Sequence, residues 1–157
     1  MKLWRIAAET RTFPATDLSG KGAAINPGRW NNDAEAVDYS APTIGIAVLE
    51  TAAHIDDGGL TLNRFLVEIE VPDAVWEART VRAVATLSPQ WDAILAGMAS
   101  ANVGSAWLAS QRSAILLVPS VIVPEEFAAL INPVHPDALK ITAKAVRKFE
   151  YNRLFRR

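Results

Sequence analysis

The chain has 157 residues, of which half are hydrophobic and 21% are charged, and its formal net charge is −1. This length suits one domain with a sizeable core, and the composition is that of a folded globular protein without a disordered tract. The charge provides no overall positive field for nucleic acid or anionic lipid, and the absence of cysteine excludes disulfides and thiolate metal sites. The opening residues lack the long apolar stretch of a signal peptide and no later run reaches membrane-spanning length, so we expect a cytoplasmic protein.

The first third of the chain predicts a short strand, a long loop and a helix. Leu3 to Ala7 is the expected opening strand, and it carries Arg5. From Phe13 to Asn32, glycine, proline, asparagine and serine recur, which predicts a loop; loops of this length inside a compact domain are usually functional. Ser40 to Pro42 indicates a helix start, and we expect the helix from Thr43 to Ile55.

The remainder of the chain alternates between short strands and short helices. Leu62 to Val71 has apolar residues at every second position, which is the period of a half-buried strand. The order of elements predicts a single mixed α+β domain over residues 1–157. The other elements we expect are a short strand from Trp76 to Val84, helices beginning at Ser88 and spanning Asn102–Gln111, a β-rich run from Ala114 to Val123, a short helix at Pro124–Glu126, and one or two strands between Ala138 and Phe155.

Glu50 is the most informative single residue, because it is the only carboxylate in the helix expected from Thr43 to Ile55. That helix is apolar or small almost throughout, which predicts a position in the core. A buried carboxylate is costly unless it is paired, and perturbed carboxylates gather at functional sites. Two other interpretations stay open: an exposed Glu50 on a solvated stripe, or a structural pair with His54 one turn away.

The long loop contains a second group of candidate residues, between Asn26 and Asn31. Arg29 offers a planar fork of donors that suits phosphate or carboxylate. Trp30 either stacks on a base or packs the loop onto the core, and Tyr39 either packs or presents its face to a flat cationic ring. Taken alone, the segment is more typical of a structural turn than of a binding site.

Ser120 follows a proline inside a β-rich run, which indicates a bulge or an edge because the strand ladder loses a donor there. The hydroxyl of Ser120 then lies where regular pairing fails and is available to a ligand. A triad of Ser120, His135 and Asp137 is a competing arrangement, but no Gly-x-Ser-x-Gly turn surrounds the serine. His54 and His135 do not have the spacing of metal ligands, so we expect no metal.

Taken in chain order, these segments resemble the RES domain, a family named after its Arg, Glu and Ser residues. The resemblance extends from Leu3 to Leu154, and it departs from the family pattern at Asn152, where Asp is frequent, and at Ala128 or Ala129, where Asn is. The segments that carry it are Gly28–Asn31, Tyr39–Ser40, Ala47–Glu50, Trp107–Leu108, Leu117–Ser120, Leu130–Pro136 and Phe149–Leu154.

The resemblance implies an ADP-ribosyltransferase-like fold, in which short helices flank a central split, mostly antiparallel β-sheet core. It implies NAD⁺ as substrate, without a metal. It also implies a toxin of a type II toxin–antitoxin pair, neutralised by an Xre-like antitoxin with a helix-turn-helix DNA-binding domain. ADP-ribose then passes to water, to phosphate or to a host protein, and the sequence does not choose among these acceptors.

The resemblance also implies roles for the candidate residues. Cleavage of the nicotinamide–ribose bond passes through an oxocarbenium-like state, whose positive charge Glu50 is expected to stabilise. Arg29 is expected to bind the pyrophosphate and Tyr39 to stack on nicotinamide, while Arg5 enters by analogy with the first-strand arginine of some ADP-ribosyltransferases. The full set of expected NAD⁺-binding residues is Arg5, Arg29, Trp30, Tyr39, Ser120 and Asn132.

Two other classes of function remain as alternatives. A non-catalytic interaction module would use the same cleft to bind a protein partner, without turnover of NAD⁺. A nuclease toxin is disfavoured, because the sequence has neither a basic patch nor a convincing acid–base pair of histidines. We therefore expect contact with an antitoxin and with an acceptor, but not with nucleic acid or a membrane.

Overall fold

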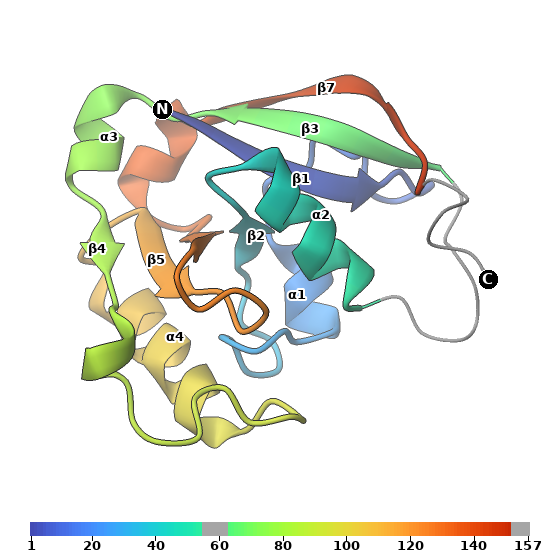
Figure 1. The fold of residues 1–157 in the computed structure, drawn as a ribbon. Coiled ribbons are helices and arrows are strands. Elements are labelled where there is room, and N and C mark those ends of the chain that lie inside the picture. Colours follow the sequence, from blue (N-terminus) through green and yellow to red (C-terminus); the bar gives the residue numbers. More distant parts are fainter. Residues whose placement is uncertain (55–62, 152–157) are drawn as a thin grey trace.

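The architecture rests on two β-sheets that face each other, as the computed structural model shows for residues 1–54 and 63–151 (Figure 1). The first sheet is antiparallel throughout, and the second is antiparallel except where β4 pairs with β5. In order, the first sheet contains β1 (Lys2–Ala8), β3 (Arg64–Glu70) and β7 (Thr142–Phe149). In order, the second contains β2 (Asp38–Ser40), β6 (Phe127–Ile131), β5 (Ile115–Pro119) and β4 (Thr80–Val81).

A backbone bridge between Trp4 and Ala41 joins the two sheets, with a 2.8 Å hydrogen bond in each direction. Since Ala41 directly follows β2, this bridge holds the end of β2 beside β1. The mixed α+β fold with a split, mostly antiparallel core is therefore confirmed. The helical elements are α1 (Lys21–Ile25), α2 (Ile44–Ala52), α3 (Asp73–Glu77) and α4 (Met98–Ser110), with 3₁₀ turns at Val84–Thr86 and Pro136–Lys140.

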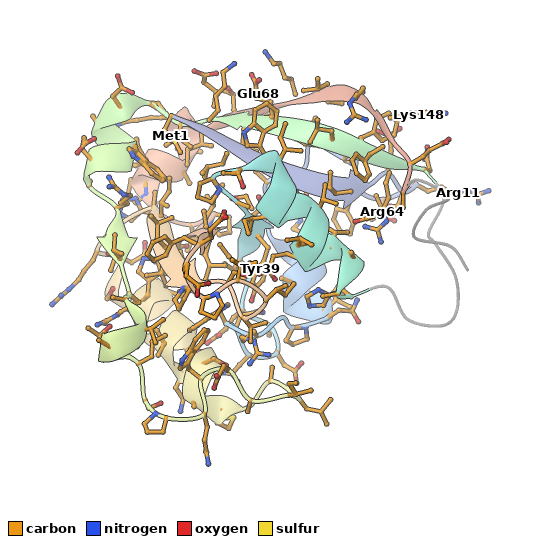
Figure 2. All side chains as sticks on the ribbon, in the orientation of Figure 1. Met1, Arg11, Tyr39, Arg64, Glu68 and Lys148 are labelled. Carbon is orange, nitrogen blue, oxygen red and sulfur yellow. The ribbon has the colours of Figure 1, made fainter. Side chains whose placement is uncertain are left out.

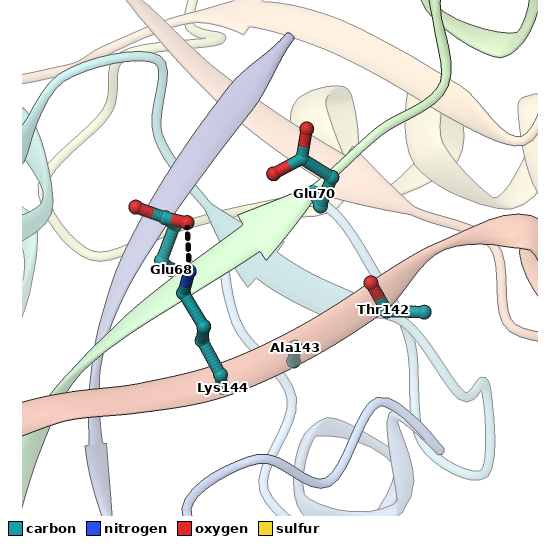
Figure 3. Close-up of a pocket in the computed structure, with 5 residues that line it drawn as sticks. All are labelled: Glu68, Glu70, Thr142, Ala143 and Lys144. Carbon is teal, nitrogen blue, oxygen red and sulfur yellow. Dashed lines mark ion pairs between the residues drawn. The ribbon is translucent and has the colours of Figure 1, made fainter.

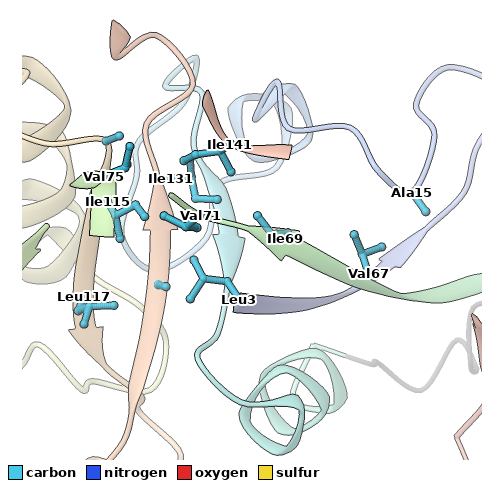
Figure 4. Close-up of a cluster of buried hydrophobic side chains, with 12 residues drawn as sticks. Leu3, Ala15, Val67, Ile69, Val71, Val75, Ile115, Leu117, Ile131 and Ile141 are labelled. Carbon is cyan, nitrogen blue, oxygen red and sulfur yellow. The ribbon is translucent and has the colours of Figure 1, made fainter. Parts of the chain in front are cut away.

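The largest hydrophobic cluster fills the space between the sheets (Figure 4). Alternate residues of a strand point to opposite faces, so Leu3 of β1 and Val67 and Ile69 of β3 face the second sheet. Ile115 and Ile131 meet them from β5 and β6. Burial of these side chains is the main contribution to holding the sheets together.

Two smaller clusters cover the outer faces. Beneath the second sheet, Leu116 and Leu130 pack against Trp91, Trp107 of α4, and Trp30. Against the first sheet, α2 buries Ile46 and Ala47 on Ile6, Leu66 and Ala41. No helix within the described residues is both long enough and apolar enough to cross a membrane.

Several elements differ from those expected. The predicted loop from Phe13 to Asn32 contains α1, and Trp76 lies on α3 before the two residues of β4. Ser88 and Pro124 begin turns and not helices. The late strand expected after Ala138 is present as β7 within the residues that the structure describes. Strand β6 was missed, because a five-residue apolar run does not distinguish a strand from a helix by its period.

The helix α2 is not fully buried, contrary to expectation. Only Ile46 and Ala47 are buried, whereas Ile44 and Leu49 are about two-fifths exposed. The helix begins where predicted, because the Thr43 hydroxyl caps it by accepting a hydrogen bond from the Ile46 amide. The predicted helix end at Ile55, the start of the next strand at Leu62, and the family ending at Asn152–Leu154 lie outside the described residues.

Candidate active site

Glu50 of α2 and Ser120 form the central contact of the site. Ser120 directly follows β5, and its Oγ donates a hydrogen bond of 2.6 Å to Oε1 of Glu50. The same Oγ accepts hydrogen bonds of 3.2 Å from the amides of Ile122 and Val123. A hydroxyl has one proton and two lone pairs, so the two amides direct that proton onto the carboxylate. Ser120 is buried and Glu50 half-buried, so Ser120 fixes the orientation of a carboxylate that solvent still reaches.

Tyr39 of β2 supports the loop that carries Arg29 (Figure 2 labels Tyr39). Its hydroxyl accepts a 3.0 Å hydrogen bond from the Trp30 amide and donates one of 2.8 Å to Asn31 Oδ1. Gly28 lies so close that a Cβ atom there would be 2.7 Å from the Tyr39 ring, so a larger residue at this position would displace Tyr39. Burial raises the pKa of the Tyr39 phenol far above its usual range, and the hydroxyl therefore keeps its proton.

Asn31 holds the same loop from inside and was not among the predicted site residues. It is buried, and its Nδ2 donates to the carbonyls of Ala23 and Glu35 at 2.9 and 3.0 Å. Its Oδ1 accepts from the Gly28 amide at 2.9 Å. Buried asparagines that satisfy several backbone groups fix loop conformation. The sequence signals for it were its place in the Gly- and Pro-rich loop and in the Gly28–Asn31 segment that carries the family resemblance.

Arg29 belongs to the same loop and reaches a different segment of the chain. Its Nη1 donates to the carbonyls of Trp91 and Ala93, each at 2.9 Å. Arg29 and Glu50 act on Tyr39 electrostatically, the cation lowering and the carboxylate raising the pKa of the phenol. The structure therefore brings together Arg29, Tyr39, Glu50 and Ser120, which the sequence places up to 91 positions apart.

Two expected NAD⁺-binding residues have other surroundings. Trp30 is 3% exposed and stacks on Trp91 with ring centroids 6.1 Å apart, so it belongs to the core beneath the site. Asn132 is fully buried and follows the end of β6, whereas Ser120 pairs with Glu126 at the start of that strand. The structure does not bring these two residues to the Glu50 carboxylate.

Arg5 is engaged in a buried network between the sheets. Its Nη1 pairs with Asp38 of β2, and its Nη2 donates to the carbonyls of Ala15 and Asp17 at 2.6 and 2.7 Å. Burial raises the pKa of Asp38 to about 6, although the Arg5 cation opposes that shift. This network anchors the strand that carries Tyr39.

The two histidines lie outside the group formed by Arg29, Tyr39, Glu50 and Ser120. His54 Nδ1 lies 2.7 Å from the backbone carbonyl of Glu50, so the pair that forms does not involve the carboxylate. His135 Nδ1 accepts from the Asp137 amide and lies past the end of β6, away from Ser120, which leaves no hydrolytic triad. Within residues 1–54 and 63–151, no three potential metal ligands cluster.

A second charged cluster lies on the first sheet, apart from these residues (Figure 3). Glu68 of β3 pairs with Lys144 of β7 at 2.9 Å and with Lys2 of β1 at 3.0 Å. The two lysines lower the pKa of Glu68 through these hydrogen bonds. The cluster crosses all three strands and is explained by its role in pairing them.

Comparison with known proteins adds family relationships to this geometry. The family model described as the RES domain matches residues 2–153. The Prs ADP-ribosylating toxin of Sphingobium sp. (strain YBL2) is 54% identical over 149 residues, covering 95% of this chain and 92% of that protein. A protein named Toxin Res from Yersinia enterocolitica is 37% identical over 141 residues, covering 86% of each chain.

A solved structure shares the fold. The crystal structure of the M. tuberculosis MbcT–MbcA toxin-antitoxin complex contains a chain that matches 93% of this one with a TM-score of 0.62. That match covers 84% of the other chain at 17% sequence identity, so it establishes the architecture alone.

Proposed function

The chain belongs to the RES domain family, and on that premise we propose that it is an ADP-ribosylating toxin that cleaves NAD⁺ at the nicotinamide–ribose bond. The observation that carries the proposal is the 2.6 Å hydrogen bond from Ser120 to Glu50, beside Tyr39 and Arg29. The names of relatives with 54% and 37% identity support it.

Glu50 supplies the electrostatic part of the reaction. As the bond breaks, its electron pair leaves with nicotinamide and positive charge develops on the ribose. A carboxylate held in place before the reaction stabilises that charge without reorganising during it. Oε1 of Glu50 accepts the hydrogen bond from Ser120, so we assign Oε2 to the contact with the ribose.

Arg29 and Tyr39 bind the rest of the substrate. Nη1 of Arg29 is used by two backbone carbonyls, which leaves Nη2 and Nε for the pyrophosphate. Tyr39 supports this loop through its hydroxyl and offers its ring to nicotinamide. Arg5 acts indirectly, by anchoring β2 through Asp38.

The reaction also requires an acceptor for ADP-ribose. We take Prs as the first candidate, since the relative from Sphingobium is named for acting on it, with water and phosphate as the other acceptors. The partner that restrains the toxin is an Xre-like antitoxin with a helix-turn-helix domain, and the site of action is the cytoplasm.

The test is to measure nicotinamide release from labelled NAD⁺, with protein alone, with purified Prs and with cell lysate. We expect Glu50→Gln to lower release by at least about 100-fold, because the charge is lost while the shape remains. Glu77→Gln, on an exposed glutamate of α3, is the matched control and should be fully active. Absence of Glu50-dependent release in all three mixtures would leave the non-catalytic interaction module as the better explanation.

A further inference from the structure

We infer that Glu35 is a positioning residue for NAD⁺, because its carboxylate ties the loop that carries Arg29 to helix α4. The inference rests on the proposed function and deepens it, since Arg29 is the residue assigned there to the pyrophosphate. Glu35 acts by accepting hydrogen bonds and not through its charge, and this distinguishes its role from that of Glu50.

One carboxylate oxygen of Glu35 accepts hydrogen bonds from two elements. Its Oε2 accepts 2.8 Å from the Asn32 amide of the loop and 2.7 Å from Oγ of Ser105, which lies on α4. Oγ of Ser105 also accepts a 2.8 Å hydrogen bond from Nδ2 of Asn32. All three side chains are half-buried, so this closed group is partly shielded from water.

The turn from Asn32 to Glu35 has a backbone conformation that its residues do not favour. Ala34 has a φ of 65°, in the left-handed region that side chains with a Cβ atom rarely adopt. A residue persists there when surrounding contacts determine its conformation. The carboxylate of Glu35 supplies two such contacts, and its carbonyl accepts a 3.0 Å hydrogen bond from Nδ2 of Asn31.

Helix α4 contacts the same loop through its backbone. A Cβ atom at Gly104 would be 1.6 Å from the carbonyl oxygen of Trp30, so a side chain here would push the helix and the loop apart. Gly104 directly precedes Ser105, and Trp30 directly follows Arg29. One turn of α4 therefore holds both ends of the segment Trp30–Glu35.

Arg29 lies directly before this held segment. Its Nη1 donates to the carbonyls of Trp91 and Ala93, so the guanidinium is fixed at one side only. The contacts of Glu35 and Gly104 fix the backbone that follows the arginine. Without the bonds of Glu35, we expect the backbone to loosen and the guanidinium to take a wider range of positions. Binding of the pyrophosphate then has to order the loop, which weakens the affinity.

Kinetics separates the two carboxylates near Tyr39. Glu35 and Glu50 both lie close enough to raise the pKa of the Tyr39 phenol electrostatically, so proximity alone does not distinguish their roles. The pyrophosphate is remote from the bond that breaks, so its contacts are equal in the ground state and the transition state. Loss of such a contact raises KM and leaves kcat unchanged. Loss of the Glu50 charge at the reacting ribose lowers kcat instead.

The experiment measures steady-state nicotinamide release by Glu35→Ala, Glu35→Gln and Ser105→Ala. We expect Glu35→Ala to raise KM for NAD⁺ by about tenfold with kcat unchanged, since two hydrogen bonds are lost. Glu35→Gln should match the wild type, because an amide oxygen accepts the same two bonds. Ser105→Ala should raise KM by about threefold, since the loop keeps its bond to the Asn32 amide.

Matched controls come from the same kinds of residue elsewhere. Glu77→Ala, on an exposed glutamate of α3, and Ser110→Ala, on an exposed serine at the end of α4, should have the wild-type KM. Thermal unfolding checks that every variant is folded. If Glu35→Ala does not fold, Ser105→Ala decides, because it leaves the turn from Asn32 to Glu35 in place.

Three results would overturn the inference. A wild-type KM in Glu35→Ala, or in Ser105→Ala where that variant decides, would show that α4 does not position the loop for NAD⁺. A fall in kcat that is equal in Glu35→Gln and Glu35→Ala would mean that the charge of Glu35 acts on the reaction itself. If the wild type releases no nicotinamide, the proposed function fails before any variant is compared, and the inference fails with it.

Discussion

Ser120 shares one hydroxyl among three partners, and this sharing makes it a positioning residue for Glu50. Two backbone amides approach its oxygen and its proton goes to the carboxylate. The sequence indicated that the residue lies next to a break in a strand with its hydroxyl available to a ligand, but it did not indicate Glu50 as the partner of that hydroxyl. Neither the length of that break nor the approach of α2 to it can be read from local pattern, since both depend on how the two sheets pack.

Removing this hydroxyl should affect both turnover and stability. Ser120→Ala frees Glu50 to rotate, and we expect kcat for nicotinamide release to fall by about tenfold to 100-fold with a smaller change in KM. It also leaves the amides of Ile122 and Val123 without their partner, which should lower the free energy of unfolding by about 1–3 kcal/mol. Urea unfolding and steady-state kinetics measure the two effects. A variant with wild-type kcat would show that Ser120 does not orient the carboxylate.

At the scale of single residues, Tyr39 provides a second test of how the site is held in place. Tyr39→Phe keeps the ring but removes the hydroxyl that joins the Trp30 amide to Asn31. We expect weaker binding of NAD⁺, because the loop that presents Arg29 loosens, and a loss of about 1–3 kcal/mol in the free energy of unfolding. Calorimetric titration in a Glu50→Gln background measures the affinity without turnover. Unchanged affinity would contradict the supporting role of the hydroxyl.

At the scale of elements, the predictions were correct where one strong local signal determines the element. They were wrong where tertiary packing determines its position or burial. The start of α2 was predicted from Ser40–Pro42, although Ser40 lies in β2 and the residue that caps the helix is Thr43. The strand β3 was predicted because its apolar residues alternate. The burial of α2 was predicted wrongly, since the helix buries only Ile46 and Ala47 and leaves Ile44 and Leu49 accessible. The role of Asp38 was not foreseen, because its partner Arg5 comes from a strand 33 positions away.

The Arg5–Asp38 pair between β1 and β2 predicts a pH dependence of stability. Burial raises the pKa of Asp38 from an ordinary value of 3.8 to about 6, so between these values the folded protein binds more protons than the unfolded chain. The contribution of Asp38 to the free energy of unfolding therefore falls as pH rises from about 4 to 6 and is constant above. Glu68, whose pKa is lowered, acts in the opposite sense, since its contribution is lost as pH falls.

Asp38→Asn isolates the first of these effects. Urea unfolding of wild type and variant between pH 4 and pH 8 should give a difference in stability that changes between pH 4 and 6 and is level at higher pH. The Glu68 contribution cancels in that difference because both proteins keep it. A difference that does not vary with pH would mean that Asp38 titrates at its ordinary value.

At the scale of the whole molecule, the site is assembled from three parts of the fold: a helix, a sheet and a loop. Glu50 comes from the helix on the first sheet, Tyr39 and Ser120 come from the second sheet, and Arg29 comes from the loop between α1 and β2. A ligand that contacts all of them should stabilise the entire fold, because it binds the folded state and not the unfolded chain.

This coupling predicts a thermal shift. With Glu50→Gln to prevent consumption, NAD⁺ at about 100 times its Kd should raise the free energy of unfolding by about 2.7 kcal/mol. The same concentration should have little effect on the double variant that also contains Arg29→Ala. Differential scanning calorimetry measures both, and equal shifts in the two proteins would remove Arg29 from the binding site.

The way in which Arg29 holds the loop before α4 has a consequence for divergence among relatives. The guanidinium is bonded to the carbonyls of Trp91 and Ala93, which are groups that every amino acid possesses. The side chains at positions 94 and 95 are therefore free to change without disturbing the arginine. The tip of this loop can therefore diverge in sequence while the two hydrogen bonds that anchor Arg29 stay the same.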